Sequence, residues 1–348
     1  MTMHYNAVEI RGPDDFGVRS FDGEAPAPGE VAIAVEAVGV CGTDIEIVDG
    51  TMPYFTSGAA SYPIVPGHEW VGRVVEAGAG VTRFVAGDRV VGECSVGCMR
   101  CHRCMAGLYH QCANRTETGI LNRSGGFSER IVFPELFLHP ISEDVSLNAA
   151  ALVEPTAIAF NGVKKASVSP RDRVAVFGDG PIGLLLMMVA KAFGARSVAV
   201  VGATKSRLAH AVRLGADLAI DVTAQDPRAQ LLEYGDGSLP DVVLEATGNP
   251  AAVPAAIEAA APGGRVVLQG LFAGGKVREL CFDHLVVNDI SLLGALGSPG
   301  IWPDVIALIE SGEVDPAAIV THELALDQFG EGIRLVKARE ALKVIVRP

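Results

Sequence analysis

The glycine-rich segment 178–183 constrains the fold of this chain more than any other feature. It reads G-D-G-P-I-G, follows a short apolar stretch at 173–177 and opens a longer apolar stretch at 181–193. The first stretch has the composition of a strand and the second that of a helix. A glycine pattern of this kind between a strand and a helix predicts a βαβ unit that binds a dinucleotide.

Each glycine has its own physical role in such a turn. Gly178 permits the tight turn, Gly180 lets the backbone approach a pyrophosphate, and Gly183 lets the helix pack closely on the sheet. The N–H groups at the start of the helix attract phosphate. The alternative is a purely structural glycine turn. The dinucleotide-binding residues expected in this segment are Gly178, Gly180, Pro181, Ile182 and Gly183.

The elements around this segment predict the fold class. After residue 149, strands and helices alternate, which indicates an α/β fold with a doubly wound parallel sheet. Before it, short strands separated by glycine and proline indicate a β-rich barrel or sandwich. Because 348 residues exceed one ordinary core, two domains are expected. The expected strands are 31–40, 70–77, 88–91, 173–177, 197–201, 241–245, 265–268 and 290–293, and the expected helices are 149–165, 181–193, 206–214 and 304–311.

The end of the strand at 197–201 bears on the choice of dinucleotide. An acidic residue there would bind the ribose 2′-hydroxyl of NAD, but the strand is followed by G-A-T-K-S-R. Gly202 leaves room for a 2′-phosphate, while Thr204, Lys205 and Arg207 offer a hydroxyl and two cations. The sequence therefore favours NADP over NAD. The alternative is that Lys205 and Arg207 are solvated surface residues.

Five of the seven cysteines lie within residues 94–112. Cys98, Cys101, Cys104 and Cys112 have the spacing C-x2-C-x2-C-x7-C, which predicts a closed structural zinc site. An iron–sulfur cluster is the competing interpretation. Cys94 is left out of this ligand set, and Cys281 is expected to be a small buried hydrophobe.

A second set of candidate ligands suggests an open metal site. Cys41, His68 and Glu69 lie in short glycine-containing segments, and Glu154 is a carboxylate among apolar residues. A thiolate, an imidazole and a carboxylate leave one zinc position open for water or an alcohol. Taken singly, Cys41 could be a buried core thiol and His68 an ordinary loop histidine.

Composition excludes several classes of protein. The net charge of −13 disfavours binding to nucleic acid. No apolar run is long enough to span a membrane, and the N-terminus lacks the features of a signal peptide. We therefore expect a cytoplasmic protein that binds neither nucleic acid nor membrane.

In combination, these motifs resemble the zinc-containing medium-chain alcohol dehydrogenase family over essentially the whole length. The motifs that carry the resemblance are, in order, G-V-C-G-T-D at 39–44, P-G-H-E at 66–69, A-G-D-R-V at 86–90, the four cysteines, G-G-F at 125–127, V-E-P at 153–155, G-D-G-P-I-G at 178–183 and E-A-T-G at 245–248.

The resemblance implies a GroES-like catalytic domain at 1–158 and 297–348, with a zinc lobe at about 94–113, and a Rossmann domain at 159–296. It implies two zinc ions per chain, one catalytic and one structural. Thr247 is expected to contact the cofactor. A homodimer or homotetramer is expected to form through the sheet edge at 290–296.

The resemblance also assigns roles at the open site. Cys41 and His68 look like catalytic zinc ligands, and Glu69 like a ligand or exchangeable ligand. Glu154 is similar to the polyol branch of the family, which includes sorbitol, glucose and threonine dehydrogenases. Thr43 is expected to hydrogen-bond the alcohol and pass its proton outward. Many members have a histidine where this chain has Glu46, so Glu46 either carries that proton onward or is solvated.

The sequence therefore predicts hydride transfer between a nicotinamide dinucleotide and a secondary alcohol of a small polyol, cyclitol or sugar. The alternatives are a dehydrogenase of an amino alcohol or aldehyde, and a non-catalytic binding protein on the same scaffold. A zinc-ribbon nucleic-acid module conflicts with the net charge and leaves the glycine motif unexplained.

Overall fold

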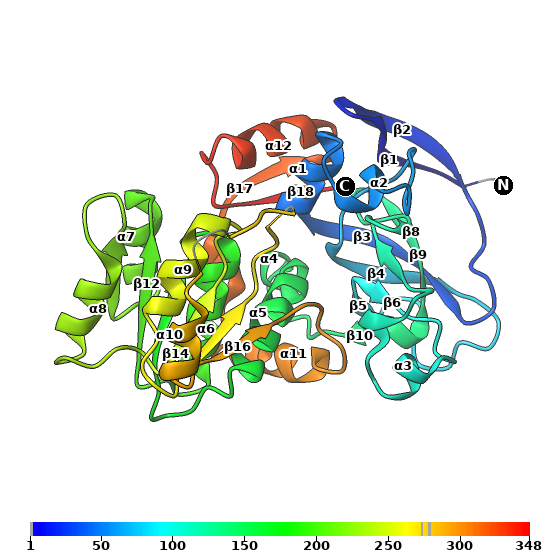
Figure 1. Cartoon of the computed structure of the whole chain (residues 1–348). Coiled ribbons are helices and arrows are strands. Elements are labelled where there is room, and N and C mark those ends of the chain that lie inside the picture. The colour runs from blue at the N-terminus through cyan, green and yellow to red at the C-terminus, as the bar shows by residue number, and fades with distance from the viewer. Residues whose placement is uncertain (1–2, 273, 278–279) are drawn as a thin grey trace. The chain divides into compact units, whose positions relative to one another are not determined.

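The computed structural model describes residues 3–272, 274–277 and 280–348. The chain divides into two compact units (Figure 1). The first unit comprises Met1–Glu154 and Trp302–Pro348, and the second comprises Pro155–Ile301. A separate apolar core stabilises each unit: one contains Trp70, Phe127 and Phe329, and the other lies around the parallel sheet of the second unit.

The first unit is built on a seven-stranded sheet with β3 (Glu30–Gly39) near its centre. Branched apolar residues alternate along β3 with small or charged ones, as a strand requires. β3 pairs antiparallel with β4 (Glu69–Ala77), β9 (Arg130–Pro134) and β18 (Lys343–Arg347). The strand β18 is close to the C-terminus, so the returning segment of the chain completes the sheet that β3 begins. The remaining strands are β5 (Arg89–Gly92), β10 (Leu138–Pro140) and β17 (Val320–Ala325).

Smaller elements complete the first unit. β1 (Met3–Gly12) and β2 (Asp15–Gly23) form an antiparallel hairpin. A three-stranded sheet joins β6 (Ser95–Val96), β7 (Thr116–Thr118) and β8 (Asn122–Arg123). Helix α1 (Gly42–Val48) follows β3 directly and packs against α12 (Phe329–Lys337), as Figure 1 shows.

The second unit contains a six-stranded sheet whose strands are all parallel, in the order β13-β12-β11-β14-β15-β16. Read by chain position, this is the doubly wound order 3-2-1-4-5-6, and the prediction of an α/β fold is confirmed. The strands are β11 (Arg173–Phe177), β12 (Ser197–Gly202), β13 (Leu218–Asp221), β14 (Val242–Glu245), β15 (Arg265–Leu268) and β16 (Ser291–Gly294). The helices are α6 (Pro181–Ala192), α7 (Lys205–Arg213), α8 (Pro227–Tyr234), α9 (Val253–Glu258) and α10 (Phe282–Val287).

The stretch 149–165, expected to be helical, forms two helices rather than one. The structure has α4 (Leu147–Ala151) and α5 (Val153–Lys165), separated at Leu152. Pro155 explains the break, because inside one continuous helix its ring would clash with the carbonyl four residues earlier. In the first turn of α5 its missing N–H costs nothing. The break also sets Glu154 at the start of α5.

Helix α11 (Trp302–Glu310) begins the returning segment of the first unit. Within the described part of the chain, no helix has both the length and the apolar character needed to cross a membrane.

Candidate active site and metal sites

The strand pair β3–β4 assembles the first group of candidate ligands. Its register sets Gly39, the last residue of β3, opposite Glu69, the first residue of β4. Cys41 follows the end of β3, and His68 precedes the start of β4. A thiol sulfur, an imidazole nitrogen and a carboxylate oxygen therefore meet, and these atoms of Cys41, His68 and Glu69 all lie within 4.8 Å of one another. The group lies in the first unit, where β3 runs into α1 (Figure 1).

Glycine is required at position 39 by the Glu69 carboxylate, because a Cβ atom there would collide with Glu69 Oε2. The carboxylate is held by Lys343, whose Nζ lies 2.5 Å from Glu69 Oε2 and donates to Val40 O at 2.9 Å. Both side chains are almost fully buried, at 3% and 1% exposure. Sequence reasoning missed Lys343, since it lies about 270 residues along the chain from Glu69 and only the β18–β3 pairing brings the two together.

Two further carboxylates lie near this group. Asp44 accepts a hydrogen bond from the Cys41 backbone N–H at 2.8 Å and is fully buried. Burial raises the pKa of Asp44 to about 6, although the nearby His68 opposes the shift. Glu154 is also buried, outside the group of three. Its pKa is raised to about 7 by burial, with His68 lowering it and Glu69 raising it further.

These residues fit a divalent metal ion. Burial lowers the pKa of His68, but Cys41, Asp44 and Glu154 together outweigh burial, and the net shift is upward. His68 Nδ1 is buried and makes no hydrogen bond to any described residue. A partly buried thiol and three buried carboxylates thus lie together with one buried imidazole and one buried ammonium group. A cation compensates such buried anions, and thiolate, imidazole and carboxylate are the ligands that zinc prefers.

The two expected proton carriers lie on α1. Thr43 is in its first turn, with Oγ1 3.9 Å from Cys41 Sγ. Glu46 lies one turn further along and is half-buried, and burial raises the pKa of its carboxyl. A raised pKa suits a proton carrier near neutral pH.

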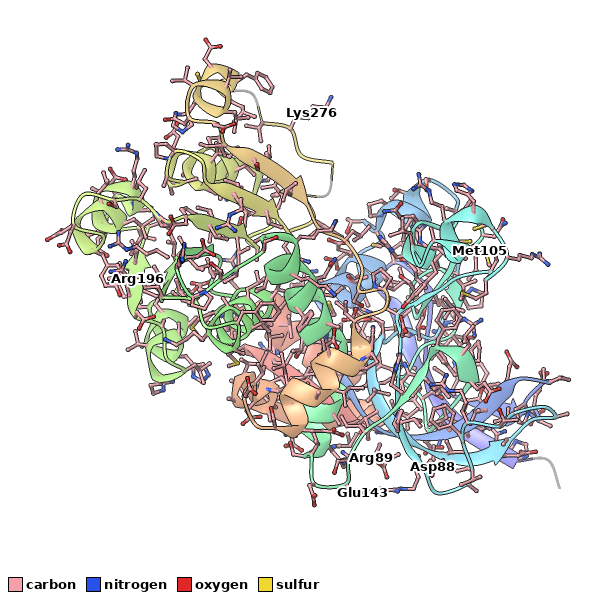
Figure 2. All side chains as sticks on the ribbon, turned by 90° about the horizontal axis from the view of Figure 1, so that it is seen from below. Asp88, Arg89, Met105, Glu143, Arg196 and Lys276 are labelled. Atoms are coloured by element: carbon pink, nitrogen blue, oxygen red, sulfur yellow. The ribbon has the colours of Figure 1, made fainter. Side chains whose placement is uncertain are left out.

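The four cysteines of the expected structural site also converge. The sulfur atoms of Cys98, Cys101, Cys104 and Cys112 lie within 4.8 Å of one another, and none of the seven cysteines forms a disulfide. Cys101 Sγ and Cys112 Sγ are 3.7 Å apart, close to the roughly 3.8 Å edge of a tetrahedron with zinc–sulfur bonds of about 2.3 Å. The lobe also carries Met105, which is 76% exposed (Figure 2).

Local structure pre-forms this lobe. Cys101 precedes α3 (His102–Met105), Cys104 lies within it, and Cys112 follows a 3₁₀ turn at Tyr109–Gln111. The pKa of the Cys98 thiol is lowered to about 6. The hydrogen bond from the Arg100 backbone N–H is the largest cause, and the hydrogen bond with the Cys112 side chain is the second. A thiol that ionises readily suits metal binding.

The remaining two cysteines lie outside both groups. Cys94 is mostly buried, and burial raises the pKa of its thiol. The expectation that Cys281 is buried is wrong, because the structure exposes it immediately before α10. A short, exposed helix offers no core against which this side chain could pack.

The glycine motif forms the turn between β11 and α6. Gly178 has φ +130, and a side chain there would press on the backbone of Ala246. Gly183 touches the Gly178 carbonyl, so a Cβ atom would clash. No atom lies within 4 Å of a Cβ built on Gly180, and the α6 N-terminus receives no side-chain cap from it. The first N–H groups of α6 thus face open space suitable for an anion.

A carboxylate lies at the end of β12 after all. Asp179 Oδ2 accepts hydrogen bonds from the backbone N–H groups of Ala203 and Thr204 at 3.0 and 2.7 Å. It also fills the space above Gly202, where a Cβ atom would be 2.5 Å from the same oxygen. Sequence reasoning considered only the residues that follow β12 and missed Asp179. Its position, next to the first glycine of the motif, was the available signal.

The other expected cofactor residues are placed as follows. Lys205 begins α7, and Arg207 lies in the first turn of the same helix. Thr247 follows β14, and both its N–H (2.8 Å) and its hydroxyl bond to Glu245 Oε1. Glu245 is fully buried, and burial raises its pKa. The Thr247 hydroxyl therefore already donates its hydrogen bond to Glu245, and only the lone pairs of its oxygen can accept a hydrogen bond from a cofactor.

A polar cluster of Tyr54, Arg115 and Glu117 lies beside the first metal group. Arg115 donates to Tyr54 Oη and to Glu117 Oε1, each at 2.7 Å, and Tyr54 donates to Glu117 Oε1 at 3.3 Å. Backbone packing ties it to the ligands, because a Cβ atom on Gly119 would be only 2.5 Å from Gly67 N. Sequence reasoning did not identify these three polar residues.

Two family models match the chain. Residues 27–143 match the alcohol dehydrogenase GroES-like domain, and residues 181–311 match the zinc-binding dehydrogenase domain.

Relatives are similar over nearly the full length. An erythritol/L-threitol dehydrogenase of Mycolicibacterium smegmatis is 33% identical, with 98% of this chain and 97% of the relative covered. A sorbitol dehydrogenase of Halalkalibacterium halodurans is 33% identical, with 97% of each covered. An L-threonine 3-dehydrogenase of Anaeromyxobacter sp. is 34% identical over 91% of this chain and 90% of the relative.

Solved structures agree. A protein described as a zinc-binding dehydrogenase from Sinorhizobium meliloti, bound to NADP, has a TM-score of 0.93 and 28% identity, with 99% of this chain and all of that chain covered. An Escherichia coli alcohol dehydrogenase complexed with NADH has a TM-score of 0.90 and 28% identity, with 99% of each covered. The chain belongs to the zinc-type medium-chain dehydrogenases, in their alcohol and polyol branch, and is an oxidoreductase of that class.

Proposed function

We propose that this enzyme oxidises a secondary alcohol of a small polyol, cyclitol or sugar, with NADP as the preferred hydride acceptor. The observation that carries the proposal is the buried group of Cys41, His68 and Glu69, in which a thiolate, an imidazole and a carboxylate meet. Glu154 nearby supports the polyol branch, to which relatives named for erythritol/L-threitol and sorbitol belong.

Cys41 and His68 would hold the catalytic zinc, with Glu69 or Glu154 as a third ligand. Zinc bound there supplies a Lewis acid that lowers the pKa of the substrate hydroxyl. Lys343 holds Glu69 by its ion pair, so Glu69 can bind the metal only by leaving that pair. This favours Glu69 as an exchangeable ligand and Glu154 as the resting one.

The chain's own groups move the proton. Thr43 Oγ1 would accept the proton of the substrate hydroxyl and pass its own proton on, while a bound nicotinamide would accept the hydride, so that the O–H and C–H bonds break and a C=O bond forms. Glu46, half-buried on the same helix, would then carry the proton toward solvent. The four-cysteine lobe would hold the structural zinc, which would take no part in this transfer.

The choice of NADP rests on the charges near β12. Lys205 and Arg207 in the first turn of α7 offer cations to a 2′-phosphate. Asp179 opposes this, because its carboxylate lies against Gly202 and would repel a phosphate. That observation favours NAD as the second candidate, and the relatives with solved structures include one bound to NADP and one to NADH.

Tyr54 and Glu117 would recognise substrate hydroxyls other than the reacting one. The segment of Glu117 packs beside the ligand-bearing turn through Gly119, and Tyr54 is hydrogen-bonded to Glu117. A carboxylate with a phenol can accept and donate hydrogen bonds to a diol. A substrate with a single hydroxyl would not use these contacts.

An absorbance assay for reduced nicotinamide tests the proposal. Zinc-replete enzyme is mixed with erythritol, threitol, sorbitol, a cyclitol, L-threonine and 2-butanol, with NAD and NADP in parallel. Turnover fastest with a polyol and NADP supports the proposal. Turnover confined to L-threonine would show that the substrate is an amino alcohol and not a polyol. Turnover with NAD alone would show that NAD, not NADP, is the cofactor.

The variant Glu117→Gln tests substrate recognition. It should raise KM for the polyol about tenfold, as expected for one lost hydrogen bond to a charged group, while leaving 2-butanol unaffected. Glu129→Gln is the matched control, because Glu129 is a carboxylate that accepts the backbone N–H of Asn6 in the β1–β2 hairpin. Equal losses with both substrates would argue for a structural role of Glu117.

We also propose a homodimer or homotetramer formed through the β16 edge. Among the described strands, β16 pairs with β15 alone, so its other edge has backbone groups that no described strand pairs. Leu292, Leu293 and Leu296 are 38%, 37% and 54% exposed, and Phe282 on α10 is 70% exposed. An exposed apolar edge of this kind is typical of a surface covered by a second copy.

A further inference from the structure

A pocket with four arginines lies in the second unit, away from the glycine motif. It has a volume of about 600 Å³ and is lined by Arg171, Arg173, Arg196 and Arg228. Arg173 begins β11, Arg171 shortly precedes it, and Arg196 immediately precedes β12. Because the strands are parallel, these positions share one edge of the sheet. Arg228, in the first turn of α8, closes one side of the pocket. Arg196 is labelled in Figure 2.

This edge is opposite the expected dinucleotide site. The glycine motif follows the carboxyl end of β11, whereas the arginines lie at its amino end. A five-residue strand is roughly 15 Å long, so one anion cannot contact both sets of residues. The pocket is therefore not part of the proposed active site.

The arginines have donors to spare. Arg173 donates one guanidinium N–H to Gly235 O at 2.8 Å, and Arg228 donates its Nε–H to Glu258 O at 3.2 Å. These single bonds orient the two side chains and leave their other N–H groups available. The side chains of Arg171 and Arg196 form no hydrogen bond or ion pair with other described residues.

Acidic groups do not neutralise the pocket. Asp241 is the one carboxylate among the lining residues, and its Oδ2 accepts the Arg173 backbone N–H at 2.8 Å. The neighbouring Asp172 is buried, and its oxygens are taken by the Ser169 N–H and by Arg265. Four guanidinium groups thus surround one concavity on a chain whose net charge is −13. Such a local excess of positive charge attracts an anion.

We propose that this pocket binds a small organic anion with two or more phosphate groups. Guanidinium groups bind phosphate oxygens in pairs, and several arginines around one site favour a polyphosphate over a single carboxylate. The volume lies in the range of small-molecule sites. The concave shape and the overall negative charge of the chain favour such a ligand over nucleic acid.

Calorimetric titration with inorganic pyrophosphate tests the proposal. The zinc-replete full chain is first saturated with dinucleotide, so that the glycine motif is occupied. We expect one pyrophosphate per chain, bound at least tenfold more tightly than inorganic phosphate. Absence of binding, or equal affinity for the two anions, would overturn the proposal.

The double variant Arg171→Ala/Arg196→Ala locates the site. It should weaken pyrophosphate binding at least tenfold and leave folding unchanged, since neither side chain has a partner to lose. The control Arg19→Ala/Arg339→Ala removes the same charge from two exposed arginines elsewhere and should bind as the wild type does. Undiminished binding by the first variant, or equal loss in both, would contradict the assignment.

Discussion

At the scale of single residues, the ion pair between Lys343 and Glu69 is the feature that most changes the interpretation of the site. A buried charge that loses its partner is costly, whereas an exposed one is not. Lys343 therefore fixes where Glu69 lies when no metal is bound, and it joins the C-terminal strand to the candidate ligands.

We expect Lys343→Met to destabilise the metal-free protein by about 3 kcal/mol or more, because the Glu69 carboxylate is left buried without its cation. Urea unfolding of chelated protein measures this. Arg347→Met is the control on the same strand, where the half-exposed pair with Glu323 should contribute less than about 1 kcal/mol. A loss no larger than that of the control would mean that the pair does not stabilise the fold. Adding Glu69→Gln should restore part of the loss.

Asp179 permits a second prediction at this scale. Asp179→Asn should raise the preference for NADP over NAD by roughly tenfold, because removing one repulsive charge near a 2′-phosphate is worth about 1.4 kcal/mol. The ratio of kcat/KM for the two cofactors measures the change. Asp217→Asn, a carboxylate paired with Lys191 at the other end of the sheet, should leave the ratio unaltered. An unchanged ratio in Asp179→Asn would remove Asp179 from cofactor selection.

At the scale of elements, the β3–β4 pair and the cysteine lobe differ in how they assemble ligands. The lobe uses neighbours in sequence: Cys104 lies in the short helix α3, Cys101 immediately precedes that helix, and Cys98 lies three residues before Cys101. The first metal group uses two strands and depends on their register, so that Cys41 and His68 meet only once the sheet has formed.

The lobe should lose its metal independently of the first group. Cys101→Ser should reduce the zinc content from two ions per chain to one and lower the Tm, because a structural zinc site stabilises its own loop. Cys94→Ser is the control, since Cys94 lies beside the lobe but outside the ligand set, and it should retain both ions. Metal analysis together with thermal unfolding measures the two effects. Two ions retained in Cys101→Ser would contradict the assignment of this residue as a ligand.

A structural element could be predicted from the sequence when the interactions that form it involve residues close together in the chain. The glycine turn after β11 was predictable because the spacing of its three glycines is a local pattern and Gly183 contacts Gly178, although Gly178 also packs against the distant Ala246. The division of 149–165 into two helices was not predicted, although Pro155 was a local signal for it. Periodicity alone gave one continuous helix, and the clash of the proline ring decided otherwise.

At the scale of the whole molecule, the exposed β16 edge should determine assembly. Leu292→Lys/Leu296→Lys should give a monomer by light scattering, because charges on an edge strand oppose pairing with another copy. Val212→Lys is the control, since this residue is equally exposed on α7. An unchanged molar mass in the double variant would place the interface elsewhere or show that the chain is monomeric.

The sequence by itself determined the class of fold, the glycine turn and the candidate ligands, because these depend on residue type and on short spacing. The tertiary structure alone decided which distant side chains meet. The β18–β3 pairing brought Lys343 to Glu69, the turn after β11 set Asp179 against Gly202, and the parallel strands gathered four arginines at one edge. The physical reason is that a contact between distant residues depends on register and packing, which the folded sheet fixes and the local sequence does not.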